Sequence, residues 1–425
     1  MKVLVIGQGG REHAIVQALS LSSSVTEIHA LPGSDGIAKN ALCHNIDWKN
    51  FEAVHQLCLN TEIDVVMIGP EDPLVAGLSD FLRERGVLTV GPSQAAANLE
   101  GSKVFAKEFM GSAKIPTAEY HKVSTVEQTL SAAKNFTPPY VLKADGLAAG
   151  KGVFICKTLA ELESSAKSLF VEHSLGAAGT RALLEQFSAG WELSYLILTN
   201  GQDFQSLPIS QDHKRLHENE EGPNTGGMGT IAPLKISARL KEQIDQKIVW
   251  PTLKEIQRRG FVYRGIIFFG LMITESGPSL LEYNCRFGDP ETQVILPLID
   301  EDFGQVLMEL AQGRLKNLKL KNVAAACVVM AAPGYPINPE KGVFINGDLE
   351  NESVSNYFLH AGTKKNSLGN WITNGGRVLN AVGLGTDFSE AIQNAYRQAN
   401  KARWNGMQLR QDIGAKQKNE ITSST

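Results

Sequence analysis

The chain has 425 residues, a formal net charge of -4 and five cysteines. This length is too great for one hydrophobic core and predicts about three domains. The slightly acidic balance offers no basic surface for nucleic acid or an anionic membrane, so small molecules are the expected partners. The cysteines show no CxxC or close Cys/His spacing, which argues against a disulfide framework and a zinc site. Since the sequence shows neither a signal-peptide pattern nor an apolar run of membrane-spanning length, we expect a soluble, cytoplasmic protein.

Residues 1–101 alternate short apolar runs with helical patterns, and each run ends in Gly or Pro. This pattern is typical of an open, mostly parallel α/β sheet, which binds ligands at the carboxyl ends of its strands. A dinucleotide-binding fingerprint fails after the first strand, because its third glycine position holds Glu12 and no acidic residue ends the second strand. Gly9, Gly10 and Arg11 either hold a phosphate or only form a tight turn. The predicted strands are residues 3–6, 27–31, 64–68 and 88–90.

A glycine-rich loop at residues 145–152 lies between two predicted strands, at 140–144 and 153–155. A Walker loop would need Ser or Thr after Lys151 and then a helix, so this loop is a different device. A glycine loop between two strands predicts a flap over a polyphosphate, with bare amides and Lys151 facing the anion. Lys143, in the incoming strand, is interpreted as a phosphate ligand, although a lysine in a strand is usually exposed to solvent.

A hinge at Gly190 separates predicted strands at residues 183–187 and 193–198. Its exposed backbone groups suit the edge of an adenine ring, and Glu192 suits a pair of ribose hydroxyls. Surface acids beside a turn are common, however, so this segment alone does not establish a nucleotide site.

A dense polar run at residues 210–215 precedes a glycine-rich loop at 222–229. Such a loop costs conformational entropy unless its backbone must approach another molecule closely, so we interpret it as a substrate loop rather than a long surface turn. His213 is a candidate general base. The sequence offers it no spacing-matched partner, so a binding or structural role is favoured.

The segment at residues 280–286 is the most informative stretch of the chain. If it is a strand, Glu282, Asn284 and Arg286 share one face, because side chains alternate. Two oxygen ligands beside a guanidinium suit a magnesium ion that holds phosphate oxygens. A half-buried strand with a merely solvated polar face is the alternative. The opposite face is expected to be core, in an antiparallel pair with the run at 266–273, and carries Leu281, Tyr283 and Cys285.

The last section predicts a smaller α+β domain. It has strand-like runs at residues 324–330 and 375–382, and a helix at about 387–400 whose apolar residues recur at helical spacing. The polar end at residues 415–425 is expected to be a disordered tail. The expected division is an N-terminal Rossmann-like domain at 1–101, a central domain at 102–322 with a flap subdomain at about 122–190, and a C-terminal domain at 323–414.

The order of Lys103, Lys143, the glycine flap, the hinge and the Glu282-x-Asn284 strand resembles that of the ATP-grasp carboxylate ligases. Within them the chain resembles the phosphoribosylamine–glycine ligase (glycinamide ribonucleotide synthetase) family, up to about residue 414. The family commonly has two acids after the hinge glycine, where this chain has Trp191 and Glu192. The strings that carry the resemblance are GGREHA at 9–14, LEGSK at 99–103, KADGLAAGKGV at 143–153, QDHKR at 211–215, GPNTGGMG at 222–229, NCRFGDPETQ at 284–293 and TNGGRVL at 373–379.

The resemblance implies that ATP lies under the flap of central ATP-grasp domains, with Mg²⁺ or Mn²⁺ held by Glu282 and Asn284. Glycine would form glycyl phosphate, from which the amine of 5-phosphoribosylamine would displace phosphate. The implied catalytic residues are Arg286 and Lys143. The implied ATP-binding residues are Lys103, Lys143, Gly146, Gly150, Lys151, Gly152, Glu185, Phe187 and Glu192. The implied substrate-binding residues are Gly9, Gly10, Arg11, Asp212, His213, Lys214, Asn224, Thr225, Gly226, Gly227, Arg286 and Asp289, of which Asp289 would hold the glycine ammonium.

The resemblance further implies a role in de novo purine biosynthesis, transient contact with neighbouring enzymes of that pathway, and no nucleic-acid or membrane partner. Two alternatives stay open: an ATP-grasp ligase for a different carboxylate or amine, and a non-catalytic nucleotide-binding protein. An NAD-dependent dehydrogenase is disfavoured by Glu12.

Overall fold

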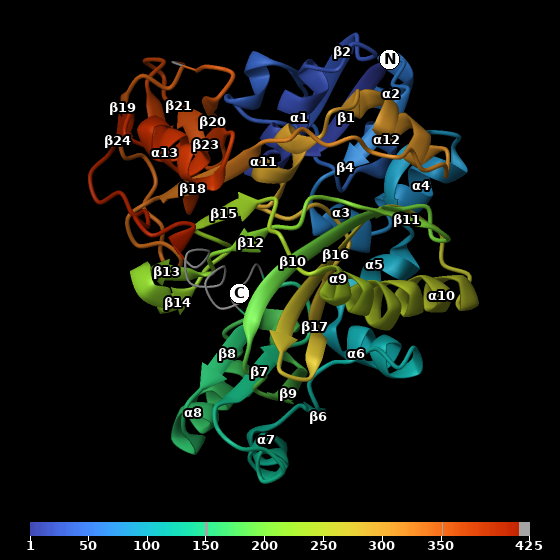
Figure 1. Cartoon of the computed structure of the whole chain (residues 1–425), viewed down its shortest axis with the longest axis vertical. Helices are drawn as coiled ribbons and strands as arrows, with labels where there is room; N and C mark the ends of the chain where they lie inside the picture. Colours follow the sequence, from blue (N-terminus) through green and yellow to red (C-terminus); the bar gives the residue numbers. More distant parts are fainter. Residues whose placement is uncertain (149–151, 351, 416–425) are drawn as a thin grey trace.

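The structure is a computed structural model of the chain and describes residues 1–148, 152–350 and 352–415. The predicted flap residues Gly150 and Lys151, and the tail from residue 416 onwards, lie outside the described residues. The predicted fold class is confirmed: a sheet with a parallel part, a central antiparallel part and a small C-terminal α+β part. In Figure 1 the N-terminal elements (blue) and the C-terminal elements (red) share the upper half of the molecule, and a smaller sheet lies below them.

The N-terminal part confirms the predicted open parallel sheet. Its strands are β1 (Lys2–Gly7), β2 (Glu27–Pro32), β3 (Leu42–Cys43), β4 (Val65–Ile68) and β5 (Thr89–Pro92). They lie in the order β5-β4-β1-β2-β3, and each neighbouring pair is parallel. The apolar runs are buried because a parallel sheet is covered on both faces. The helix α1 (Gly10–Ser20) begins where β1 ends.

One long strand, β16 (Tyr263–Thr274), joins the N-terminal sheet to the central one. Its first residues pair antiparallel with β5, and the rest pairs with β10 (Trp191–Thr199) and β17 (Gly277–Asn284). A short edge strand, β11 (Phe204–Ser206), completes a nine-stranded sheet. The predicted pairing of the 266–273 run with the 280–286 segment is therefore confirmed.

A β-bulge interrupts the β16–β17 pair, and one face prediction is wrong because of it. Gly270 pairs with Glu282 but the next residue, Leu271, pairs with Leu280, so Leu281 is the extra residue. The alternation expected for an ideal strand is broken there, and Leu281 lines the cavity described below instead of the core. Tyr283 and Cys285 are buried in the core as predicted.

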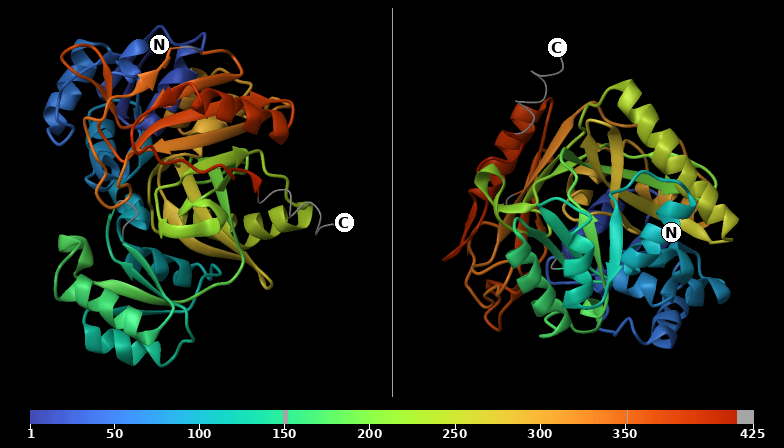
Figure 2. Two further views of the ribbon diagram at one scale, coloured as in Figure 1. Left: turned by 90° about the vertical axis from the view of Figure 1, so that its left-hand side faces the viewer. Right: turned by 90° about the horizontal axis from the view of Figure 1, so that it is seen from below.

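A four-stranded antiparallel sheet with two helices forms the lower body in Figure 1 and the left view of Figure 2. The strand order is β6-β9-β7-β8, and a separate apolar cluster fills the space between sheet and helices. The glycine flap lies between β7 and β8, as predicted. The elements are β6 (Tyr120–Val123), α7 (Val126–Ala133), β7 (Tyr140–Ala144), β8 (Val153–Cys156), α8 (Leu159–Phe170) and β9 (Ala182–Gln186).

The C-terminal sheet takes two strands from the middle of the chain. Its order is β12 (Gln211–Asp212), β15 (Gly229–Ala232), β18 (Ala324–Ala331), β23 (Arg377–Gly385) and β20 (Asn356–His360). The helix α13 (Phe388–Ala399) is capped by Asp387 and covers this sheet, with Ala391, Ala395 and Ala399 buried as its spacing predicts. The proposed domain boundaries stay a prediction, because hydrogen-bonded strands cross them.

No described helix is both long enough and apolar enough to cross a membrane. The remaining elements connect these sheets. They include the helices α2 (Phe51–Asn60), α3 (Glu71–Val75), α4 (Leu78–Glu84), α5 (Gln94–Gly101), α6 (Lys103–Ser112), α9 (Ala238–Ile244), α10 (Trp250–Arg258), α11 (Thr292–Ile295) and α12 (Phe303–Ala311), and the paired strands β13 (Arg215–His217) and β14 (Glu221–Asn224), β19 (Asn346–Gly347) and β24 (Ala402–Arg403), and β21 (Thr363–Lys365) and β22 (Trp371–Thr373).

Candidate active site

A cavity of about 480 Å³ lies where the sheets meet. Its wall combines the start of α3, the end of β17, the start of α6, the β7–β8 hairpin and residues 224–226. Most of the predicted site residues contribute to it, although they come from segments far apart in the sequence. They are Arg11, Lys103, Lys143, Gly146, Gly152, Glu185, Phe187, Glu192, Lys214, Asn224, Thr225, Gly226, Glu282, Asn284, Arg286 and Asp289.

A charged cluster, called the floor below, lines the cavity beside the β7–β8 hairpin and consists of Lys103, Lys107, Lys143 and Glu185. Lys143 Nζ lies 2.9 Å from Glu185 Oε2 and 3.4 Å from the carbonyl oxygen of Leu281. Burial acts to lower the pKa of Lys143, but Glu185 outweighs it and raises this pKa, so the lysine stays charged. Lys103 Nζ donates to the carbonyl of Gly146, 3.3 Å away. This hydrogen bond links α6 to the first residues of the glycine loop.

Lys107 is a member of this floor that the sequence did not single out. Its Nζ lies 3.4 Å from Glu185 Oε2 and donates to Thr117 Oγ1 at 2.7 Å. Burial lowers its pKa to about 8. The one signal in the sequence was its spacing. Lys107 follows Lys103 by four residues, about one helical turn, so the two lysines share a face of α6.

Glu282 and Asn284 face the cavity side by side, as predicted. Burial acts to raise the pKa of Glu282, but Lys214, Lys143 and Lys103 together outweigh it and hold this pKa below its usual value. An ionised carboxylate and an amide oxygen fit a divalent cation that also binds substrate phosphates, because magnesium needs only one or two protein carboxylates there. Among the described residues, no group of three or more His, Cys, Asp or Glu side chains is arranged to hold a metal.

Arg286 is held by two carboxylates that sequence reasoning missed. Its Nε lies 3.2 Å from Glu71 Oε2, its Nη2 lies 2.8 Å from Glu100 Oε1, and Nη2 also donates to Asn284 Oδ1 at 3.1 Å. Glu100 Oε2 accepts the backbone N–H of Cys285 at 2.7 Å. Glu71 begins α3 at the carboxyl end of β4, the position where open α/β sheets carry ligand-binding residues.

The two carboxylates beside Arg286 titrate in opposite directions. Burial acts to raise the pKa of Glu71, but Arg286 and Arg11 outweigh it and lower this pKa to about 2. Glu100 is more deeply buried and is repelled by Glu71, so burial raises its pKa to about 7 in spite of Arg286. Glu71 is therefore ionised beside the two arginines, and Glu100 is held close to protonation.

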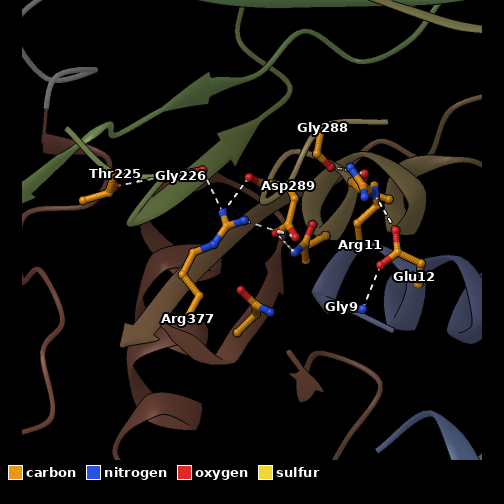
Figure 3. Close-up of polar contacts among 12 residues, drawn as sticks. Gly9, Arg11, Glu12, Thr225, Gly226, Gly288, Asp289 and Arg377 are labelled. Atoms are coloured by element: carbon orange, nitrogen blue, oxygen red, sulfur yellow. Dashed lines mark hydrogen bonds and ion pairs between the residues drawn. The ribbon is translucent and has the colours of Figure 1, made fainter. Parts of the chain in front are cut away.

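Asp289 and residues 224–226 of the glycine-rich loop line another part of the cavity. Figure 3 shows Asp289 and Gly226 beside Arg377. Asp289 Oδ1 accepts from Gln293 Nε2 at 2.8 Å, and Asp289 Oδ2 lies 3.3 Å from Arg377 Nη2. Burial acts to raise the pKa of Asp289, but Arg377 and Arg11 outweigh it and lower this pKa. An ionised carboxylate facing the cavity is suited to a substrate ammonium group.

Two of the three residues predicted after β1 are not among the described residues that line the cavity. The backbone N–H of Gly9 donates to Glu12 Oε2 at 2.7 Å, and Gly10 is buried against the side chain of Asn380. Arg11 does line the cavity, and its Nη1 donates to the carbonyl of Phe287 at 3.2 Å. Glu12 stands where a dinucleotide-binding fingerprint would have its third glycine, and its carboxylate accepts the Gly9 N–H within the same loop (Figure 3).

Asp212, His213 and Gly227 are also not among the described residues that line the cavity. Asp212 Oδ2 lies 2.8 Å from Nζ of Lys214, which does reach the cavity. His213 is buried, with Nδ1 3.1 Å from the carbonyl of Gly229 and Nε2 accepting the N–H of Gly414 at 3.2 Å. This environment favours the structural interpretation of His213.

Phosphoribosylglycinamide synthetase domains match almost the whole chain. The N domain of that family matches residues 1–100, its ATP-grasp (A) domain matches 101–292, and its C domain matches 325–416. The cavity residues belong to all three matched parts.

Curated relatives and solved structures agree with these matches. The chain is 41% identical to the phosphoribosylamine–glycine ligase of Caldanaerobacter subterraneus over 98% of its length and 100% of the relative, and 40% identical to that of Pseudomonas aeruginosa over 97% of both chains. The crystal structure of the Thermotoga maritima phosphoribosylamine–glycine ligase has a TM-score of 0.85 at 36% identity, covering 97% of this chain and 100% of that one. A biotin carboxylase domain from Hydrogenobacter thermophilus, at 19% identity and a TM-score of 0.73, shares the fold over 96% of this chain and 91% of that one. The chain belongs to the phosphoribosylglycinamide synthetase family of ATP-grasp ligases.

Proposed function

We propose that this enzyme ligates glycine to 5-phospho-D-ribosylamine at the expense of ATP, giving glycinamide ribonucleotide, ADP and phosphate in de novo purine biosynthesis. The observation that carries this proposal is one cavity that joins a lysine floor under a flap, the ionised Glu282 beside Asn284, and Arg286 beside Asp289. Such a reaction requires positions for a polyphosphate, a divalent metal and an ammonium group close together, and these residues suit them.

The reaction has two steps, a phosphoryl transfer and then an acyl transfer. A glycine carboxylate oxygen attacks the γ-phosphorus of ATP, the bond to ADP breaks, and glycyl phosphate forms. The amine of phosphoribosylamine then attacks the glycyl carbonyl, phosphate leaves, and the amine loses a proton. Neither step needs a covalent bond to the protein, so alignment and charge neutralisation by the cavity residues can supply the catalysis.

The side chains have distinct roles in this scheme. Lys103 and Lys143 bind the phosphates of ATP, and Arg286 steadies the group that is transferred. Asp289 holds the glycine ammonium, which leaves the carboxylate directed towards the phosphates. A divalent cation at Glu282 and Asn284, Mg²⁺ or Mn²⁺, would supply positive charge to the phosphate oxygens when bound. A closed flap keeps water away from the labile acyl phosphate.

Release of ADP tests the function. We expect ADP to form only when ATP, glycine and phosphoribosylamine are all present, with the unstable amine generated in place from ribose 5-phosphate and ammonia. A chain that is inactive with glycine but turns over other amino or carboxylic acids would be a different ATP-grasp ligase. Binding of ATP without turnover in any mixture would support the non-catalytic alternative.

We also propose that the enzyme works in the cytoplasm and contacts neighbouring purine enzymes transiently. A relative of the chain in Chironomus tentans is a trifunctional purine biosynthetic protein, of which the chain spans 31% at 40% identity. Cross-linking in intact cells followed by mass spectrometry checks this, since recovery of no other purine enzyme above an unrelated control would contradict it.

A further inference from the structure

Arg377 enters the cavity from the C-terminal sheet and ties two separate segments together. It begins β23, and its Nη1 donates to the carbonyl oxygens of Gly226 at 2.7 Å and Asp289 at 2.6 Å. Its Nη2 also forms the ion pair with the Asp289 carboxylate (Figure 3). One side chain thus holds the glycine loop, the backbone of Asp289 and the carboxylate of Asp289.

The contacts around Arg377 depend on the shape of a guanidinium. Arginine presents five N–H donors in a rigid plane, so it can serve several acceptors at once, whereas the compact ammonium of lysine cannot. Gly226 lies against this plane: a Cβ placed there would be 3.0 Å from Arg377 Cζ. The loop therefore has a glycine where its backbone must approach the arginine closely.

Each side of this junction has a second support. The N–H of Gly226 donates to the Tyr335 hydroxyl at 2.9 Å, and the N–H of Gly227 donates to Thr225 Oγ1 at 3.0 Å. On the other side, Gln293 holds the second carboxylate oxygen of Asp289. Each carboxylate oxygen can accept more than one hydrogen bond, so both remain able to bind a substrate ammonium.

We propose that Arg377 is a positioning residue for the substrate end of the cavity, which fixes Asp289 and residues 225–227 in the arrangement that lets Asp289 receive the glycine ammonium. This inference rests on the proposed function. It gives the C-terminal part of the chain a share in glycine binding through Asp289, because Arg377 and Tyr335 both come from that part.

Arg410 provides a matched control in the same part of the chain. It is also an arginine paired with carboxylates, with Nε 2.7 Å from Asp412 Oδ1 and Nη1 2.7 Å from Glu220 Oε1. It is not among the described residues that line the cavity. Substituting Arg410 removes these ion pairs without touching the junction at Asp289.

The experiment compares Arg377→Met, Arg377→Lys and Arg410→Met in steady-state ADP release by the full chain, together with their melting temperatures. Losing hydrogen bonds to a charged group is expected to raise KM for glycine about 10-fold or more in Arg377→Met, with KM for ATP within about twofold of the wild type. Arg377→Lys is expected to give a smaller rise, since it keeps the charge but not the fork. Arg410→Met is expected to lower the melting temperature and leave KM for glycine unchanged.

Three results would overturn the proposal: an unchanged KM for glycine in both Arg377 variants, an equal rise in KM for ATP, or an equal rise in KM for glycine in Arg410→Met. If Arg377→Met does not fold, Arg377→Lys decides alone by the same criteria. The proposed function fails separately, in the wild type, if ADP release does not depend on glycine.

Discussion

Arg286 shows how charge is arranged residue by residue at the reaction centre. It faces Glu71 and Glu100 at once, so its charge is only partly available to a third group. In the proposed reaction, a phosphoryl group that approaches Arg286 would compete with these two carboxylates. Protonation of Glu100 leaves Arg286 with one carboxylate partner instead of two, and its positive charge is then more available to the substrate.

Glu100→Gln tests the raised pKa of Glu100. The folded protein binds this proton more tightly than the unfolded chain does, so Glu100 contributes stability that is fully present below about pH 4.5 and is lost as the pH rises through about 7. Glutamine has the shape of the protonated acid and no such dependence. We expect the melting temperature of the wild type to fall by a few degrees relative to Glu100→Gln between about pH 4.5 and 8. A constant difference in melting temperature between the wild type and Glu100→Gln across this pH range would contradict the raised pKa of Glu100.

Glu282→Gln tests the metal pair. The substitution keeps the size of the side chain but removes the charge among three lysines, so we expect ADP release to fall by about 100-fold or more, with a rise in the Mg²⁺ concentration needed for half-maximal rate. The control is Glu275→Gln, an exposed residue in the turn between β16 and β17. Both variants should keep the far-UV circular dichroism of the wild type, and an unaltered rate in Glu282→Gln would refute the metal role.

At the scale of elements, periodicity predicted most strands but not their irregularities. The parallel strands, the flap hairpin and the β16–β17 pair were predicted because apolar runs and turn residues are local signals. The bulge at Leu281 was not, because an extra residue in one strand depends on its partner across the sheet. The bulge directs the carbonyl of Leu281 to Lys143, so the missed feature belongs to the site.

The packing of α13 on β23 gives a prediction at the same scale. A Cβ added at Gly383 would collide with backbone atoms of Ala391 and Ala395, so Gly383→Ala must push the helix off the sheet. We expect a loss of about 1–3 kcal/mol in the free energy of unfolding. Gly111→Ala, in α6 with no atom within 4 Å of the added Cβ, is expected to stabilise by about 0.5–1 kcal/mol. Urea unfolding of both variants checks this, and equal midpoints would contradict it.

At the scale of the whole molecule, contacts between distant segments were beyond the sequence. Asp289 and Arg377 are 88 residues apart, and no local pattern indicates that they meet. Glu71, Glu100 and Lys107 were missed for the same reason, since each gains its role from a residue that the chain brings to it only on folding. The predicted placement of Gly9 and Gly10 at a substrate phosphate stays a prediction. The backbone N–H of Gly9 already donates to the Glu12 carboxylate, an interaction that no local pattern indicated.

Hydrogen exchange tests how the whole molecule responds to nucleotide. A non-hydrolysable ATP analogue with Mg²⁺ would bridge the flap hairpin and β17, so we expect slower amide exchange in residues 153–156 and 277–284. The helix α13 lies outside the cavity and should exchange at an unchanged rate, which makes it the internal reference. Uniform slowing throughout the chain, or none in either segment, would contradict this arrangement.

The strand β16 limits which part of the enzyme can move. Its twelve residues span about 40 Å as an extended strand, and they pair with β5 at one end and with β17 further along. The N-terminal sheet and β17, the strand that carries Glu282, therefore form one rigid unit. The body made of β6, β7, β8 and β9 is a second unit, which carries Lys143. In the proposed reaction, an opening of the cavity for nucleotide would therefore move Lys143 away from Glu282 and leave Glu282 at a constant distance from the N-terminal sheet.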